Sequence, residues 1–380
     1  MPVSRPLFAD PEPTPNPSSD SSAPMIKLGG LLDSYYSYNF TNTNPGSGNV
    51  GTFFNHQDNS FNLGLAEATL SITQGEAGGH LALVYGQESA LGLGSGPGID
   101  VLQAYVSYDP GEWSFNAGRL ESWMGVEVVE SNQDWNYSRS LLYWYTIPHW
   151  YDGLDIGWTA SDGGVGIIGY ALEGWDNPTG VTPAHGEKTF GLQVNLKPDT
   201  TWNVTFNGII GPHPYSFTDS NLGYVGEGIL TFNATDNLFF ALDAEYGGQN
   251  WGSYPMYLVN GSTVSSSSFW GAAFYARYKF DHAWALALRL EEVEDGDDLL
   301  EYWLAPLDNA NNSATANDVE AREATLTLDH KFSRNLLFRL EGRYDMALSG
   351  GQAVKAFNVI NGVPNSANQF TATASAVMSF

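Results

Sequence analysis

Apolar and polar residues alternate with a period of two over much of the chain from residue 26 onward. In the last eleven residues, FTATASAVMSF, every second residue from Phe370 to Phe380 is apolar, and the residues between them are mostly Thr and Ser. The same alternation occurs in Trp202–Ile210, Trp284–Glu291 and Leu336–Asp345. A period of two indicates β-strands with one apolar face, and no stretch shows a convincing helical period. The pattern therefore predicts an all-β protein.

The connections between the expected strands alternate between short and long. Short ones consist of turn residues, as in Asp109–Glu112 and Asp281–His282, whereas Ser122–Gly153 runs to 32 residues. Such alternation is typical of a transmembrane up-and-down antiparallel β-barrel with short periplasmic turns and long extracellular loops. About sixteen strands are expected, and this even number places both termini of the chain on the short-turn side. Their ranges are 26–41, 61–74, 79–88, 100–109, 113–121, 154–161, 164–174, 188–197, 201–211, 224–234, 238–248, 268–280, 283–293, 322–332, 336–347 and 369–380.

Alternation alone would also fit a soluble β-sandwich, whose apolar face lies in a core. Two features favour the membrane. The chain ends in Phe380 on the apolar face, which resembles the C-terminal strand signal of outer-membrane barrels. Aromatic residues of that face also collect beside the short turns, as in an aromatic girdle, although Phe and Trp are common near β-turns in any case. These residues are Tyr108, Trp113, Trp158, Phe232, Phe240, Phe280, Trp284, Phe332, Phe338 and Phe380.

Residues 1–25 differ from the rest of the chain. They are rich in Pro, Ser and acidic residues and show no hydrophobic periodicity, which predicts a disordered N-terminal segment. They contain no hydrophobic h-region, so they are not an intact signal peptide. The expected organisation is a disordered segment 1–25 followed by an outer-membrane β-barrel 26–380.

Composition excludes several classes of function. The chain carries 42 Asp+Glu against 15 Lys+Arg, a net charge of −27, which argues against nucleic acid as a partner. It has no Cys, no P-loop and no G-x-S-x-G or H-E-x-x-H motif, and its seven His show no ligand spacing. We therefore expect no enzymatic activity, no cofactor and no resident metal. The acidic stretch 291–301 could hold Ca²⁺ through carboxylate oxygens, but a solvated outer loop is the simpler interpretation.

The segment of residues 118–158 contains Gly118, Gly125 with Glu127, the Asn-Tyr-Ser-Arg-Ser element 136–140, and Pro148. In these features it resembles the OmpL-like outer-membrane β-barrel porin family. The stretch around Asp33, Tyr35 and Tyr36 and the strand Gln103–Tyr108 resemble the same family, and the likeness extends from about residue 26 to the C-terminus. The resemblance implies a passive pore without a defined substrate, and sixteen-stranded porins are commonly trimers.

The longest connection, Ser122–Gly153, is rich in Trp and Tyr, an unusual composition for a solvent-exposed loop. We predict that it folds into the barrel and narrows the lumen, packing Trp135, Tyr137 and Trp144 against the wall. The alternative is that it covers the mouth or packs into a neighbouring subunit. The charged residues of this expected constriction loop are Glu127, Glu130, Asp134 and Arg139.

Basic residues gather on one wall of the predicted barrel. By strand parity, four arginines of the last strands face the lumen: Arg277, Arg289, Arg339 and Arg343. Opposite charges on the loop and on this wall would create a transverse field across a water-filled pore. The alternative is local pairing, of Arg289 with Glu291 and of Arg343 with Glu341 and Asp345.

Three classes of function remain open. The first is a general porin, a water-filled channel for passive diffusion of small hydrophilic solutes and ions, weakly cation-preferring. The second is a substrate-selective channel, for example for sugars, that uses Tyr137, Tyr143, Trp144 and Tyr145 as an aromatic track. The third is a structural or adhesive surface barrel. The expected location is the outer membrane of a Gram-negative-type bacterium, with its lipids and lipopolysaccharide, polar solutes and a homotrimer as partners.

Overall fold

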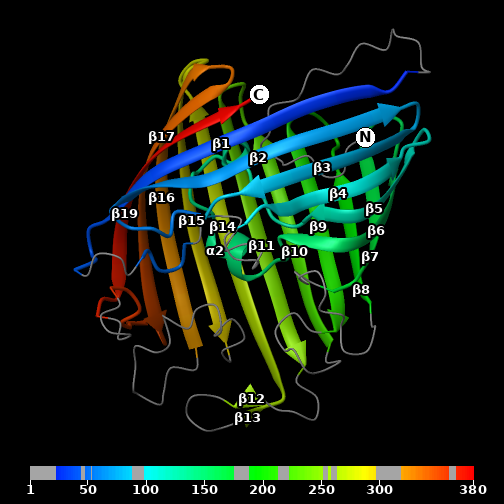
Figure 1. Ribbon diagram of the computed structural model, residues 1–380. Coiled ribbons are helices and arrows are strands. Elements are labelled where there is room, and N and C mark those ends of the chain that lie inside the picture. Colours follow the sequence, from blue (N-terminus) through cyan, green and yellow to red (C-terminus); the bar gives the residue numbers. More distant parts are fainter. Residues whose placement is uncertain are drawn as a thin grey trace.

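In the computed structural model, each long strand pairs antiparallel with its neighbours in the chain, and the first pairs with the last. Leu31 lies opposite Ser379 and Asn39 lies opposite Thr371, so β1 (Met25–Asn39) and β19 (Asn368–Ser379) close the sheet on itself. Backbone hydrogen bonds of 3.0 and 3.1 Å between Gly30 and Phe380 extend this seam. The described long strands thus form a closed barrel (Figure 1).

Sixteen long strands form the barrel, as the sequence predicts, and every predicted boundary lies within four residues of the observed one. The remaining fourteen are β2 (Ser60–Gln74), β3 (Ala77–Tyr85), β4 (Asp100–Tyr108), β5 (Trp113–Glu121), β6 (Trp150–Thr159), β7 (Val165–Leu172), β8 (Thr189–Leu196), β9 (Trp202–Pro212), β10 (Leu222–Asn233), β11 (Leu238–Asn250), β14 (Ser266–Lys279), β15 (Trp284–Gly296), β16 (Asp318–Ser333) and β17 (Leu336–Ser349).

Several short elements have no counterpart in the sequence prediction. They are the 3₁₀ turn η1 (Ser131–Gln133), the helix α2 (Leu141–Tyr145) and the two-residue strands β12 (Met256–Tyr257), β13 (Thr263–Val264) and β18 (Gln352–Ala353). Within the described residues, no helix combines the length and hydropathy needed to cross a bilayer.

The structure describes residues 23–43, 48–52, 54–87, 98–174, 188–212, 222–250, 256–257, 263–296, 318–358 and 365–380. The predicted disordered segment 1–25 lies almost entirely outside this set. Of the acidic stretch 291–301, residues 291–296 belong to β15 rather than to a loop, and residues 297–301 lie outside the described set.

Large apolar side chains face away from the barrel interior, whereas the buried charged side chains face inward. Leu28, Phe61 and Phe380 are 77%, 88% and 67% exposed, whereas Asp33 and Arg289 are fully buried. This arrangement is the reverse of a soluble sandwich, in which the apolar face forms the core. An exposed apolar surface on every strand suits the hydrocarbon of a bilayer, so the soluble alternative is excluded.

The aromatic residues beside the short turns contact one another on this outer face. The rings of Trp202 and Phe232 stack with centroids 4.1 Å apart, and Phe332 and Phe338 meet edge to face at 4.9 Å. These rings form a belt at the short-turn end of the barrel, the depth at which amphipathic aromatic groups meet lipid headgroups.

The barrel seam provides the first testable prediction. A Cβ atom on Gly30 would lie 2.7 Å from Cζ of Phe380 and 2.8 Å from the carbonyl oxygen of Glu67. Gly30→Val should therefore overpack the seam and destabilise the folded barrel by about 1–3 kcal/mol. The measurement is the temperature at which half of the protein loses the fast-migrating folded band on a semi-native detergent gel.

Gly226→Val on β10 is the matched control, because a Cβ atom added there would have no heavy atom within 4 Å. Gly226 is exposed on the lipid-facing side. Equal transition temperatures for the two variants would contradict the close packing of Phe380 on Gly30.

Candidate functional site

The connection between β5 and β6, residues 122–149, lies inside the barrel, where α2 contacts β14 and β15 (Figure 1). Its rings at Trp135, Tyr137 and Trp144 are at most 8% exposed. A Cβ on Gly271 of β14 would lie only 2.4 Å from Cδ2 of Leu142, so the absent side chain lets the helix rest directly on the wall. We call residues 122–149 the infolded loop.

The short helix of the infolded loop begins on groups that satisfy its free backbone N–H groups. The Ser140 hydroxyl accepts a hydrogen bond from the Tyr143 N–H at 3.0 Å. The N–H groups of Leu141 and Leu142 each donate to the carboxylate of Glu291 on β15 at 2.7 Å. A buried helix start needs such acceptors, and here the barrel wall supplies them.

Arg139 organises the interior of the loop itself. Its Nε lies 2.8 Å from the Asp134 carboxylate and donates to the Val128 carbonyl at 2.8 Å. Its terminal nitrogens donate to the carbonyls of Tyr137 and Val129, and its guanidinium lies 4.2 Å from the ring centre of Phe54. One buried cation thus connects distant points of the loop backbone.

Arg289 of β15 connects the loop to the wall. Its guanidinium lies 2.6 Å from Glu127 of the loop and 2.6 Å from Glu323 of β16. It also donates to the Ser138 carbonyl at 2.6 Å and to the Arg139 carbonyl at 3.2 Å. The side chain is completely buried.

The two arginines of β17 have the same role further along the wall. Arg339 pairs with Asp329 at 3.0 Å and donates to the loop carbonyls of Ser131 and Asp134. Arg343 pairs with Asp345 at 2.8 Å and donates to the Arg139 carbonyl at 2.7 Å. Arg289, Arg339 and Arg343 thus each combine a carboxylate partner on the barrel with a carbonyl partner on the loop.

Carboxylates of the wall and loop accept hydrogen bonds from the loop's backbone N–H groups, a role that the sequence alone does not reveal. Glu341 accepts hydrogen bonds from Tyr137 at 2.6 Å and from Ser138 at 3.0 Å, and Glu127 accepts one from Ser140 at 2.6 Å. Strand parity placed Glu341 on the lumen face, but only the folded loop shows what it binds.

The structure brings most of the predicted site residues into one network. Glu127, Asp134, Arg139, Arg289, Arg339 and Arg343 are connected by the contacts above, and Arg277 joins through Asp329 at 2.8 Å. Glu130 is buried in the loop, and this burial raises the pKa of its carboxyl even though Arg139 lies near. Of the local pairs named as the alternative, the structure shows Arg343 with Asp345, whereas Arg289 pairs with Glu127 and Glu323.

The four residues considered as an aromatic track, Tyr137, Tyr143, Trp144 and Tyr145, are buried in the core of the loop. Phe54 packs against Trp144 with ring centres 5.6 Å apart. Stacking on a sugar needs an accessible ring face, and these rings are covered by protein. This arrangement gives no support to a sugar track at these positions.

Comparisons with known proteins agree with this architecture. The family model described as "Putative beta-barrel porin-2, OmpL-like" matches residues 25–380, which confirms the resemblance seen in the sequence. A comparison with curated proteins found no match.

Several solved outer-membrane proteins share the fold. The channel DcaP of Acinetobacter baumannii is 15% identical with a TM-score of 0.60, covering 95% of this chain and 99% of its own. The trimer form of OmpT of Vibrio cholerae is 11% identical with a TM-score of 0.58, covering 94% and 100%. An anion-selective porin from Comamonas acidovorans is 12% identical with a TM-score of 0.57, covering 94% and 100%.

Identities this low show a shared fold, whereas the family match extends over the whole barrel. Porins are channels and not enzymes. The chain therefore belongs to the OmpL-like β-barrel porin family and is a channel protein of the Gram-negative outer membrane.

Proposed function

We propose that the protein is a water-filled channel for passive diffusion of small hydrophilic solutes and ions, and that the infolded loop forms its narrowest section. Barrels of sixteen strands are wide enough to leave an aqueous lumen. The observation that carries the proposal is the attachment of the loop to the lumen wall through Arg289, Arg339 and Arg343. A segment fixed in this way reduces the cross-section at one depth.

We further propose a weak preference for cations. Among the described residues, fifteen Asp and Glu are buried against four Arg. Each wall arginine is already paired with a carboxylate at 2.6–3.0 Å, so the arginines offset only part of the acidic charge. The remaining negative potential attracts cations over roughly 8 Å at physiological salt. Because these charges are paired, the electric field across the lumen is weaker than it would be if the arginines and carboxylates were unpaired.

The proposed surroundings follow from the outer face of the barrel. Its apolar band is suited to outer-membrane lipids and its outer end to lipopolysaccharide. A homotrimer is proposed by analogy with the trimer form of OmpT, which has the same fold. The solutes proposed for the channel are small, polar and not further defined.

The loop's position gives a test of the constriction. Deleting residues 133–145 removes α2 and the carbonyl groups that Arg289 and Arg343 bind. We expect a higher single-channel conductance in planar bilayers, because the lumen loses its narrowest section. The heat-modifiable gel band must first show that the variant folds. Unchanged conductance of a folded variant would refute the constriction.

Charge substitutions test the proposed cation preference. The double variant Arg339→Gln/Arg343→Gln leaves Asp329 and Asp345 without these partners and should increase cation preference. The double variant Glu127→Gln/Glu130→Gln should decrease it. The measurement is the reversal potential in a KCl gradient.

Arg322→Gln is the control for loss of a positive charge outside the lumen. Arg322 is exposed on the outer face of β16, where it pairs with Glu292 and Glu320. It should leave the reversal potential unchanged. An anion-selective wild-type channel would overturn the proposed preference.

A further inference from the structure

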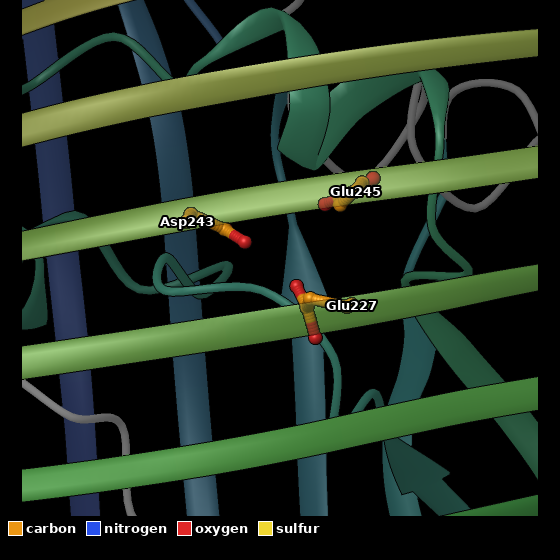
Figure 2. A group of neighbouring side chains, drawn as sticks. All are labelled: Glu227, Asp243 and Glu245. Carbon is orange, nitrogen blue, oxygen red and sulfur yellow. The ribbon is translucent and has the colours of Figure 1, made fainter.

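Three carboxylates meet on the lumen face of two neighbouring strands, apart from the arginine network. Glu227 of β10 lies directly across from Glu245 of β11, and Asp243 is two residues from Glu245 on the same strand. One oxygen from each of the three lies within 4.8 Å of the others. Figure 2 shows Asp243 reaching toward Glu227 while Glu245 lies on the same side of the strands. We call these residues the carboxylate triad.

The triad is sealed from solvent and lacks a basic partner. Glu227, Asp243 and Glu245 are 4%, 2% and 4% exposed. Within the part of the chain that the structure describes, none of the ion pairs includes any of them, in contrast to Glu323, Asp329 and Asp345. Three carboxyl groups therefore share a space from which water is largely excluded, where three negative charges would repel one another unless a cation or protons offset them.

Two oxygens of the triad have unused hydrogen-bonding capacity. Oδ1 of Asp243 and Oε1 of Glu245 are completely buried, and neither has a hydrogen-bond partner among the described residues. Buried oxygens are normally matched by a donor or a cation, because leaving water without compensation is costly. These two atoms are therefore available to a cation, or to a proton shared within the triad, which is the alternative that the test below must exclude.

Other oxygens of the triad bind both ends of the infolded loop. Glu227 accepts a hydrogen bond from the Gly125 N–H at 2.8 Å, near the beginning of the loop. Glu245 accepts one from the Thr146 hydroxyl, near the end of the loop. The orientation of these two carboxylates is therefore coupled to the place where the loop leaves and rejoins the wall.

We propose that the carboxylate triad is a binding site for a divalent cation, with Ca²⁺ as the best match. Oxygen-only ligands from carboxylates suit the hard cations Ca²⁺ and Mg²⁺. A ligand arrangement that is not a regular octahedron favours Ca²⁺, because Mg²⁺ requires nearly ideal octahedral coordination. The cation would be held by Asp243 and Glu245 through their unused oxygens and by Glu227 from the neighbouring strand. It offsets the charge of the triad and fixes the two carboxylates that anchor the loop.

The test uses the full chain, folded in detergent and stripped of divalent ions with EDTA. Calorimetric titration with CaCl₂ should show one saturable site, with a Kd of roughly 10⁻⁶–10⁻³ M by comparison with other carboxylate sites. Ca²⁺ should also raise the temperature at which the folded gel band is lost, since it binds only the folded triad. A parallel titration with MgCl₂ should show weaker binding.

Asp243→Asn should weaken Ca²⁺ binding at least about tenfold and remove the Ca²⁺-dependent rise in transition temperature. The matched control is Asp155→Asn, which changes another buried lumen carboxylate, one that accepts a hydrogen bond from Asn116 at 2.8 Å. This variant should bind Ca²⁺ like the wild type. Binding does not depend on conductance, so the outcome is separate from that of the proposed function.

Three results would overturn the proposal. The first is the absence of saturable Ca²⁺ binding. The second is binding that Asp243→Asn leaves unchanged, which would place the ion on another acidic part of the chain. The third is a transition temperature that Ca²⁺ does not raise in the wild type, together with an Asp243→Asn variant whose transition temperature is higher than that of the wild type. Both are expected if the triad shares protons instead of binding a cation.

Discussion

The packing of the infolded loop inside the barrel depends on four buried guanidinium groups, which backbone carbonyls and carboxylates surround. A guanidinium presents five N–H donors in one plane, and removing it from water is costly unless these donors are satisfied. Arg289 meets this demand with carboxylates from the loop and from β16 and with two loop carbonyls. Breaking one such buried pair typically costs about 3–5 kcal/mol, so the loop has little freedom to leave the wall.

The same alternation along a strand determines both surfaces of the barrel. On β15, Leu290 faces lipid while its neighbours Arg289 and Glu291 hold the infolded loop. A shift in register by one residue would place these two charges in the bilayer and Leu290 in the lumen. The apolar outer surface and the charged inner network therefore stabilise the same register, and neither could change without the other.

The strands and their faces could be predicted from the sequence because the period of two is a local property. The parity of β15 and β17 placed Arg289, Arg339 and Arg343 in the lumen, and the apolar composition of residues 122–149 indicated an infolded loop. The partners of these arginines could not be predicted, since they depend on how one loop lies against strands about 150–200 residues away. The pairing of Arg289 with Glu127 has no local signal at all.

The carboxylate triad is an intermediate case. Glu227 and Glu245 are 18 residues apart, but the short turn between β10 and β11 fixes the register that places them opposite each other. The proximity of the two residues could therefore be predicted from the hairpin, because they are opposite each other on neighbouring strands. Metal-ligand motifs, by contrast, are defined by spacing along the chain. In a barrel, candidate metal ligands are better sought among cross-strand pairs on the lumen face.

The infolded loop is thus fastened to the wall in two different ways. Its middle, around Ser138 and Arg139, rests on β15 and β17, where Glu323 and Asp345 each have a guanidinium partner. Its two ends, at Gly125 and Thr146, rest on Glu227 and Glu245, where the described residues provide no ion-pair partner. The negative charges of neighbouring carboxylates repel one another unless protons or a cation offset them. The arginines of β15 and β17 make the middle of the loop a permanent part of the barrel. The attachment of the loop's ends depends on the cation or protons that neutralise the carboxylate triad.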